Sequence, residues 1–267
     1  MDDATHPAIP AFGIAFQPIV DLGARRVTAQ EALVRGVGGR PAGSVLGRVA
    51  PQARREFELG VIRYAMARAV GLGLAVDLHV NLSPGVLTPP SGGAAEAAER
   101  LMRLAEAERF PLQRLVIEVT EGERIDDPAQ LRRLADAART IGLRLALDDF
   151  GAGYNGLALL ADVEPDMIKI DMALTRGLDR DRVRRAIVAG VLRMVEGGAA
   201  RIVAEGVETP AEMTALLDLG IEEMQGYLFG APAYERMQGA LTLPVPRRPE
   251  PVLASIAAPH RAVAAPH

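Results

Sequence analysis

Short apolar segments alternate with helical patterns along most of this chain, and that alternation constrains the fold more than any other feature. Eight segments have the composition of strands buried on both faces: 13–22, 26–35, 75–82, 114–121, 143–150, 166–172, 201–207 and 222–229. Between several of them, apolar residues recur every three or four positions, as in 131–141 and 187–195. Eight strands with helical crossovers predict an α/β fold, a TIM (β/α)8 barrel, and leave a doubly wound open sheet as the alternative.

The first two predicted strands differ from the rest. A short turn around Gly23 joins them, so we expect them to pair antiparallel, whereas the later strands are separated by helical crossovers. One helix has clear boundary signals. Thr209 and Pro210 are typical of the N-cap and the first helical position, and Gly220 is typical of a helix stop.

The composition limits the kinds of site that the chain can form. Its 267 residues contain no cysteine, which excludes disulfides and thiolate zinc sites, and His79 is the only histidine away from the termini. A metal would therefore be a hard cation such as Mg²⁺ or Mn²⁺, held by oxygen atoms. The net charge of −4, with both signs mixed along the chain, argues against a nucleic-acid polymer or a membrane as partner.

The sequence predicts one folded domain with a disordered N-terminal segment and a flexible C-terminal tail. No apolar run reaches the roughly 18 residues of a membrane span, and the N-terminus is unlike a signal peptide, so we expect a cytoplasmic protein. Residues 1–10 are predicted to be disordered, and the Pro/Ala-rich residues 244–267 to form a flexible tail. The folded domain is expected at 11–243.

Polar residues gather where the predicted strands end. In a barrel the carboxyl ends of the strands form one rim, and polar residues there are typical of catalytic sites. Each residue taken alone has a plain structural interpretation, such as a salt bridge, a turn cap or a solvated acid. Together they form a rim set: Glu31, Arg35, Asn81, Glu118, Glu121, Asp148, Asp149, Lys169, Asp171, Glu205, Glu208 and Gln225.

The carboxylates of this rim set would repel one another strongly unless cations compensate them. The adjacent Asp148 and Asp149 suggest one ligand that bridges two metals and one ligand of the second metal. Two ions about 3.5–4 Å apart would suit in-line attack on a phosphodiester. Adjacent strand residues point to opposite faces, so both aspartates reach one site only if the strand breaks there, which Phe150 and Gly151 favour.

The order of the motifs resembles that of a known family. The segments FQPIVDL, EALVR, VNLSP, IEVTE, DDFGAGYNGL, DMIKID, AEGVET and QGYLF follow one another as in the EAL-domain cyclic-di-GMP phosphodiesterases. The resemblance covers roughly Phe12 to Pro232 and is closest to a short subgroup with EALVRG. It implies a modified TIM barrel with an antiparallel first strand, and two Mg²⁺ or Mn²⁺ ions. It also implies hydrolysis of cyclic di-GMP to linear 5′-pGpG, and a homodimer.

The resemblance also implies roles for single residues. It assigns one metal to Glu31, Asn81, Glu118 and Asp148. Asp148 would also bridge to a second metal. It assigns the second metal to Asp149, with Glu205 as a ligand or a water-organising base. Lys169 would contact the attacking water and stabilise developing charge. The groups that it implies as catalytic are Glu31, Asp149, Lys169 and Glu205.

Substrate contacts are implied at other positions. Arg35 would grip a phosphate through its forked guanidinium. The remaining residues implied in substrate binding are Gln17, Asp171 and Gln225. Glu121 would tether the loop 150–156, and Glu208 would support the metal ligands from behind. The chain departs from the family pattern at Gly36, Asn155 and Ala231.

Two other functions remain open at this stage. One is a receptor that binds cyclic di-GMP without cleaving it, although members of that kind usually lack some metal or base residues. The other is a metal-dependent hydrolase of a different phosphoester, because a fold does not fix its substrate.

Overall fold

The computed structural model describes residues 9–87, 93–120, 128–153 and 156–240. Most of the predicted disordered start, the predicted tail 244–267, and Glu121 and Asn155 lie outside these residues. Among the described residues, no helix is long and apolar enough to cross a membrane.

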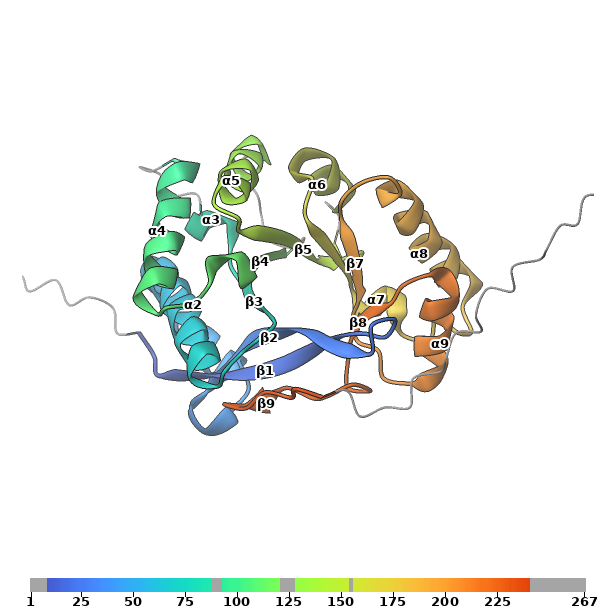
Figure 1. Cartoon of the computed structure of the whole chain (residues 1–267), viewed down its shortest axis with the longest axis horizontal. Coiled ribbons are helices and arrows are strands. Elements are labelled where there is room, and N and C mark those ends of the chain that lie inside the picture. Colours follow the sequence, from blue (N-terminus) through green and yellow to red (C-terminus); the bar gives the residue numbers. More distant parts are fainter. Residues whose placement is uncertain (1–8, 88–92, 121–127, 154–155, 241–267) are drawn as a thin grey trace, which may run out of the picture.

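Eight strands close into a barrel surrounded by helices (Figure 1). They are β1 Phe12–Asp21, β2 Arg26–Gly36, β3 Asp77–Asn81, β4 Leu115–Thr120, β5 Arg144–Phe150, β6 Met167–Ile170, β7 Arg201–Ala204 and β8 Glu223–Gln225. Strands β2 to β8 run parallel in sequence order, and β1 closes the barrel by pairing antiparallel with both β2 and β8. The predicted barrel with an antiparallel first strand is therefore confirmed.

Helices follow most of the parallel strands and cover the outside of the barrel (Figure 1). The longer ones are α2 Arg54–Gly71, α4 Ala94–Ala107, α5 Pro128–Thr140, α6 Gly156–Val163, α8 Arg182–Val195 and α9 Pro210–Leu219. Shorter ones are η1 Val37–Gly39, α1 Gly43–Leu46, η2 Pro51–Ala53, α3 Pro84–Leu87, η3 Leu112–Arg114 and α7 Met172–Thr175. Helix α8 begins earlier than the apolar pattern indicates, because Asp181 caps it by accepting hydrogen bonds from two backbone amides.

Helix α9 begins and ends where the sequence predicts. Thr209 and Glu212 form a capping box, in which each side chain accepts a hydrogen bond from the other residue's backbone amide. Gly220 ends the helix in the left-handed conformation, with φ of 95°. The capping box fixes the direction in which the chain enters the helix, and Gly220 fixes the direction in which it leaves.

Three predicted strands, at 166–172, 201–207 and 222–229, were too long. The pairing of β6, β7 and β8 ends at Ile170, Ala204 and Gln225, and the following residues leave the sheet at the barrel rim. Asp171 begins α7 there as its N-cap, which a strand would not allow. A two-residue strand that the sequence did not indicate, β9 Ala233–Tyr234, pairs with β1 on the outside of the barrel.

The barrel interior has an apolar layer at the amino ends of its parallel strands. Six buried side chains form a cluster separate from the main core: Ile19, Ala29, Val116, Ala146, Met167 and Val203. The main core lies between the sheet and the helices and includes Phe16, Phe57 and Ile62. The inner cluster closes one end of the barrel, so polar side chains further along the same strands face the other end.

Candidate active site

A layer of polar side chains lies directly above the apolar cluster. Residues two positions apart in a strand share a face, and five of these positions are polar: Glu31, Glu118, Asp148, Lys169 and Glu205. In the antiparallel β1 the same step from Ile19 leads to Gln17. The sheet thus brings together residues that are far apart in the sequence, and four of the five are less than a tenth exposed.

Lys169 is the centre of this layer. Its ammonium nitrogen lies 2.7 Å from Glu118 Oε1, 2.7 Å from Glu205 Oε1 and 2.9 Å from Asp148 Oδ1. Glu31 Oε2 is further away, at 3.4 Å. Burial acts against the charged form of Lys169, but the surrounding carboxylates outweigh it and hold its pKa well above the usual value. Lys169 is therefore charged at neutral pH.

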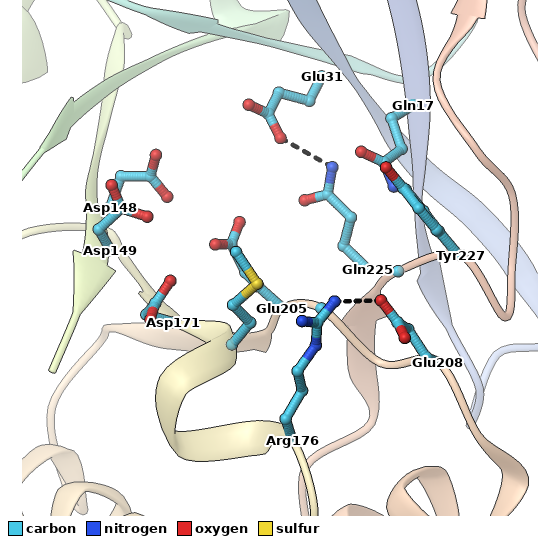
Figure 2. A pocket seen from close by; sticks show the side chains of 13 residues that line it. Gln17, Glu31, Asp148, Asp149, Asp171, Arg176, Glu205, Glu208, Gln225 and Tyr227 are labelled. Carbon is cyan, nitrogen blue, oxygen red and sulfur yellow. Dashed lines mark hydrogen bonds and ion pairs between the residues drawn. The ribbon is translucent and has the colours of Figure 1, made fainter. Parts of the chain in front are cut away.

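Amide groups orient Glu31 from both sides. Asn81 donates to Glu31 Oε1 at 3.0 Å, and Gln225 donates to Oε2 at 2.7 Å (Figure 2). Burial disfavours the ionised form of Glu31, but Lys169 and these two amides outweigh it, so its pKa is lowered. Glu31 is thus ionised and fixed in position.

Both adjacent aspartates reach the site, because the strand is interrupted at Asp149. This residue has φ of 55°, in the left-handed region that non-glycine residues rarely adopt. The pairing of β5 with β6 shifts register between Leu147 and Phe150, as in a β-bulge. The irregularity therefore lies at the aspartates themselves, which is where both side chains need it in order to reach one site. Figure 2 shows Asp148 and Asp149 side by side at one edge of the pocket.

The remaining acids of the layer hold protons more tightly than usual. Burial, followed by the charge of Glu31, raises the pKa of Glu118 well above its usual value. Burial also raises the pKa of Asp148, that of Asp149 to about 6, and that of Glu205 to about 8. Four carboxylates lie near one lysine and Asp149 is a fifth acid beside them, so the layer has more acids than positive charges.

These residues fit divalent metal ions. Carboxylate oxygens of Asp148, Asp149 and Glu205 lie within 4.8 Å of one another, close enough to hold one ion. Glu118 Oε2 is buried and has no hydrogen-bond partner among the described residues. A hard cation prefers oxygen ligands of this kind and would supply the missing positive charge.

Metal binding should therefore strengthen as the pH rises. Below their raised pKa values, Asp149 and Glu205 carry protons that a metal must displace, and above them the carboxylates are free to bind. We expect the Mn²⁺ dissociation constant to fall by about tenfold per pH unit for each displaced proton between pH 6 and 8. Calorimetry in buffers of different ionisation enthalpy measures both the affinity and the protons released. An affinity that is constant over this range would contradict the account.

The other predicted site residues lie at different distances from the acids. One pocket is lined by the acids Glu31, Asp148, Asp149 and Glu205. The same pocket is lined by Gln17, Asp171 and Gln225. Gln17 also donates to the Gly230 carbonyl oxygen at 3.2 Å, and Asp171 accepts from the Ala173 amide at 2.7 Å, so both also stabilise local structure.

Arg35 and Glu208 are not part of the acid layer. Arg35 donates to the carbonyl oxygen of Val34 at 2.8 Å and lines a neighbouring cavity of about 270 Å³, together with Asn81. Glu208 lines the same pocket as Asp148, Asp149 and Glu205, and it pairs with Arg176 (Figure 2). This contact is not with a predicted metal ligand, and the predicted supporting role of Glu208 stays a prediction.

Three side chains near the site had no role predicted from the sequence. His79 is fully buried, with Nδ1 2.7 Å from Glu118 Oε1. Burial and the nearby Lys169 lower its pKa well below the usual value, so the ring is neutral and shares one hydrogen bond with Glu118. Its place two residues before Asn81 on β3 could have indicated this contact. The other two side chains are those of Arg176 and Tyr227, which line the same pocket as the acids. Tyr227 lies two residues after Gln225 in the sequence.

The EAL-domain family profile matches residues 8–232 of this sequence. The chain belongs to the EAL-domain family. This EAL domain is also similar to solved structures. With the standalone EAL protein of Vibrio cholerae O395 in its c-di-GMP-bound form it shares 35% identity and a TM-score of 0.80, over 87% of this chain and 96% of that one. With Klebsiella pneumoniae BlrP1, solved with manganese and cyclic di-GMP, it shares 38% identity and a TM-score of 0.78, over 87% of this chain and 57% of that one.

Two curated relatives of this EAL domain carry names of different kinds. A cyclic di-GMP phosphodiesterase of Pseudomonas aeruginosa is 30% identical over 234 residues, which are 83% of this chain and 38% of that protein. The blue light- and temperature-regulated antirepressor BluF of Escherichia coli is 30% identical over 222 residues, 80% of this chain and 53% of BluF. The chain thus spans about half or less of these relatives.

Proposed function

We propose that this EAL domain is a divalent-metal-dependent phosphodiesterase that hydrolyses cyclic di-GMP to linear 5′-pGpG. The observation that carries the proposal is the rim layer of four carboxylates around one charged lysine, with Asp149 beside them. Relatives named as cyclic di-GMP phosphodiesterases, and neighbours solved with cyclic di-GMP, support this substrate.

Two sets of side chains would hold the metals, Mg²⁺ or Mn²⁺. The first set is Glu31, Asn81, Glu118 and Asp148, and the second is Asp148, Asp149 and Glu205. Bound there, the ions would lower the pKa of a water molecule and neutralise the phosphoryl oxygens.

The chain's own groups would prepare the reaction. Lys169 places a permanent positive charge beside Glu205 and Asp148, where it would orient the attacking water and offset developing negative charge. Glu205, once a metal had displaced its proton, would hold that metal or orient the attacking water and accept its proton. Gln225 and Asn81 would keep Glu31 in place, since each donates to one of its oxygens.

A substrate comparison tests this proposal. The purified chain is incubated with Mn²⁺ and, separately, cyclic di-GMP, linear pGpG and bis(p-nitrophenyl) phosphate. We expect kcat/KM to be much the highest for cyclic di-GMP. Faster cleavage of the generic diester would instead support a hydrolase of another phosphoester on the same barrel.

A second candidate is a receptor that binds cyclic di-GMP and signals to a partner. BluF favours it, because that relative is named as an antirepressor and not as an enzyme. The complete set of predicted metal ligands and Lys169 favours catalysis instead. Tight binding of cyclic di-GMP without any turnover in Mg²⁺ or Mn²⁺ would establish the receptor.

We further propose that the domain forms a homodimer, as the family resemblance implies. Sedimentation velocity over a hundredfold range of protein concentration tests the dimer. A sedimentation coefficient of a monomer throughout would contradict it.

A further inference from the structure

The interior of the barrel contains a histidine, His79, at the boundary between the apolar cluster and the acid layer. Its backbone lies in the middle of β3, in register with Glu31 of β2 and with Val116 of β4. Both of these residues face the interior, whereas Leu78 and Val80, on either side of His79, belong to the main core. The ring of His79 therefore also faces the interior, and it is fully buried there.

We propose that His79 is a positioning residue for Glu118, holding its carboxylate so that one oxygen, Oε2, is presented to a divalent metal ion. This proposal rests on the proposed function, because it takes Glu118 as a metal ligand. It goes beyond the proposed function by assigning a role to a side chain that touches neither the substrate nor a metal.

Two hydrogen-bonding groups meet the same oxygen of Glu118. Lys169 Nζ lies 2.7 Å from Oε1, and His79 Nδ1 lies 2.7 Å from the same atom. The torsion at the end of a glutamate side chain is broad and nearly two-fold, so one contact alone would let either oxygen take it. Two contacts, from β6 and from β3, instead hold the carboxylate in one orientation.

The second oxygen of Glu118 is left for another ligand. Oε2 is buried and has no hydrogen-bond partner among the described residues. An unpaired carboxylate oxygen in the interior costs stability, and a hard cation is the partner that such an oxygen prefers. The contacts at Oε1 therefore decide which oxygen remains available.

The direction of the hydrogen bond follows from the role of Glu118. A carboxylate that ligates a cation is ionised and can only accept hydrogen bonds, so Nδ1 of His79 must then carry the proton. A hydrogen bond to an ionised group is stronger than one between neutral groups. His79 thus stabilises Glu118 in the form that binds a metal.

Packing alone does not account for a histidine at this position. A leucine would fill a similar space without burying polar atoms, as the apolar side chains of the neighbouring cluster do. His79 buries two ring nitrogens, and Nε2 has no hydrogen-bond partner among the residues that the structure describes. Because an unpaired buried atom is unfavourable, the contact with Glu118 is what a histidine adds here.

Three substitutions separate the hydrogen bond from the space that the ring fills. His79→Asn can place an amide donor where Nδ1 lies, His79→Gln carries the same amide one bond further out, and His79→Leu has no donor. Calorimetry on the purified chain without substrate measures the Mn²⁺ dissociation constant. We expect Mn²⁺ to bind about 10–100-fold more weakly to His79→Leu and His79→Gln, and within about threefold of wild type to His79→Asn.

Urea unfolding in EDTA keeps folding apart from metal binding. Leu78→Val is the matched control, because Leu78 lies beside His79 on β3 but packs in the main core, away from the acid layer. This control should unfold at a lower urea concentration than wild type and bind Mn²⁺ with unchanged affinity. A loss of Mn²⁺ affinity in Leu78→Val as large as that in His79→Leu would overturn the proposal, since both would then report disturbed packing.

Other outcomes also decide the role of His79. Wild-type Mn²⁺ affinity in His79→Leu would overturn it, and so would a loss in His79→Asn as large as that in His79→Gln. The second comparison holds even if His79→Leu does not fold. Wild type that binds Mn²⁺ without cleaving cyclic di-GMP would contradict the proposed function alone, whereas wild type that binds no Mn²⁺ would contradict both.

Discussion

Replacing Glu31 by glutamine should lower the turnover of cyclic di-GMP by about 10²–10³-fold, as expected when a main source of electrostatic stabilisation is removed. Glu31 is the ionised carboxylate that Asn81, Gln225 and Lys169 all contact. A glutamine of the same shape has one amide nitrogen in place of an oxygen, so one of the three donors would face another donor. The change would also remove one negative charge from the proposed metal ligands.

Steady-state kinetics in Mn²⁺ would measure this loss. The matched control is Glu56→Gln, which removes an acid from an exposed ion pair with Arg100 on the outer helices. Exposed pairs contribute little, so the control should retain turnover within about twofold. Turnover by Glu31→Gln at the level of the control would show that Glu31 does not act in the reaction.

Replacing Lys169 by methionine should destabilise the metal-free protein by about 3–5 kcal/mol at pH 8, because it leaves buried carboxylates without the lysine that pairs with them. Lys169 is 1% exposed and lies near four carboxylates, so in metal-free buffer water cannot take its place. The loss should become smaller as the pH falls. Glu205, with a pKa of about 8, and Asp149, with a pKa of about 6, then take up protons and no longer need compensation.

Urea unfolding in the presence of EDTA, at pH 8 and at pH 5.5, would measure both effects. Saturating Mn²⁺ should restore part of the stability of Lys169→Met, since the metal supplies positive charge to the same acids. A variant as stable as wild type in EDTA at pH 8 would mean that the acid layer is protonated and does not depend on Lys169.

The barrel and its polar layer could be predicted because both follow from the regular pattern of side chains along buried strands. Buried strands read as apolar runs, and a polar residue two positions beyond an inward apolar one must face the same interior. Glu31 after Ala29 and Lys169 after Met167 are examples. The rim residues therefore lie together however far apart they are in the sequence.

Features that depend on tertiary contacts could not be predicted. The left-handed conformation of Asp149 is imposed by the shift in pairing with β6, and no local sequence signal specifies it. The direction of Arg35 depends on the side chains around the neighbouring cavity. Glu208 points toward Arg176 because Glu212 holds both backbone segments, which are more than thirty residues apart.

The most direct test of the account is product formation by the purified chain. It is incubated with cyclic di-GMP and either Mg²⁺ or Mn²⁺, and the nucleotides are separated by chromatography with and without EDTA. The account predicts that cyclic di-GMP is converted to linear pGpG with at least one of these metals and that EDTA stops the conversion. Cyclic di-GMP that stays intact with both metals, or cleavage that continues in EDTA, would contradict it.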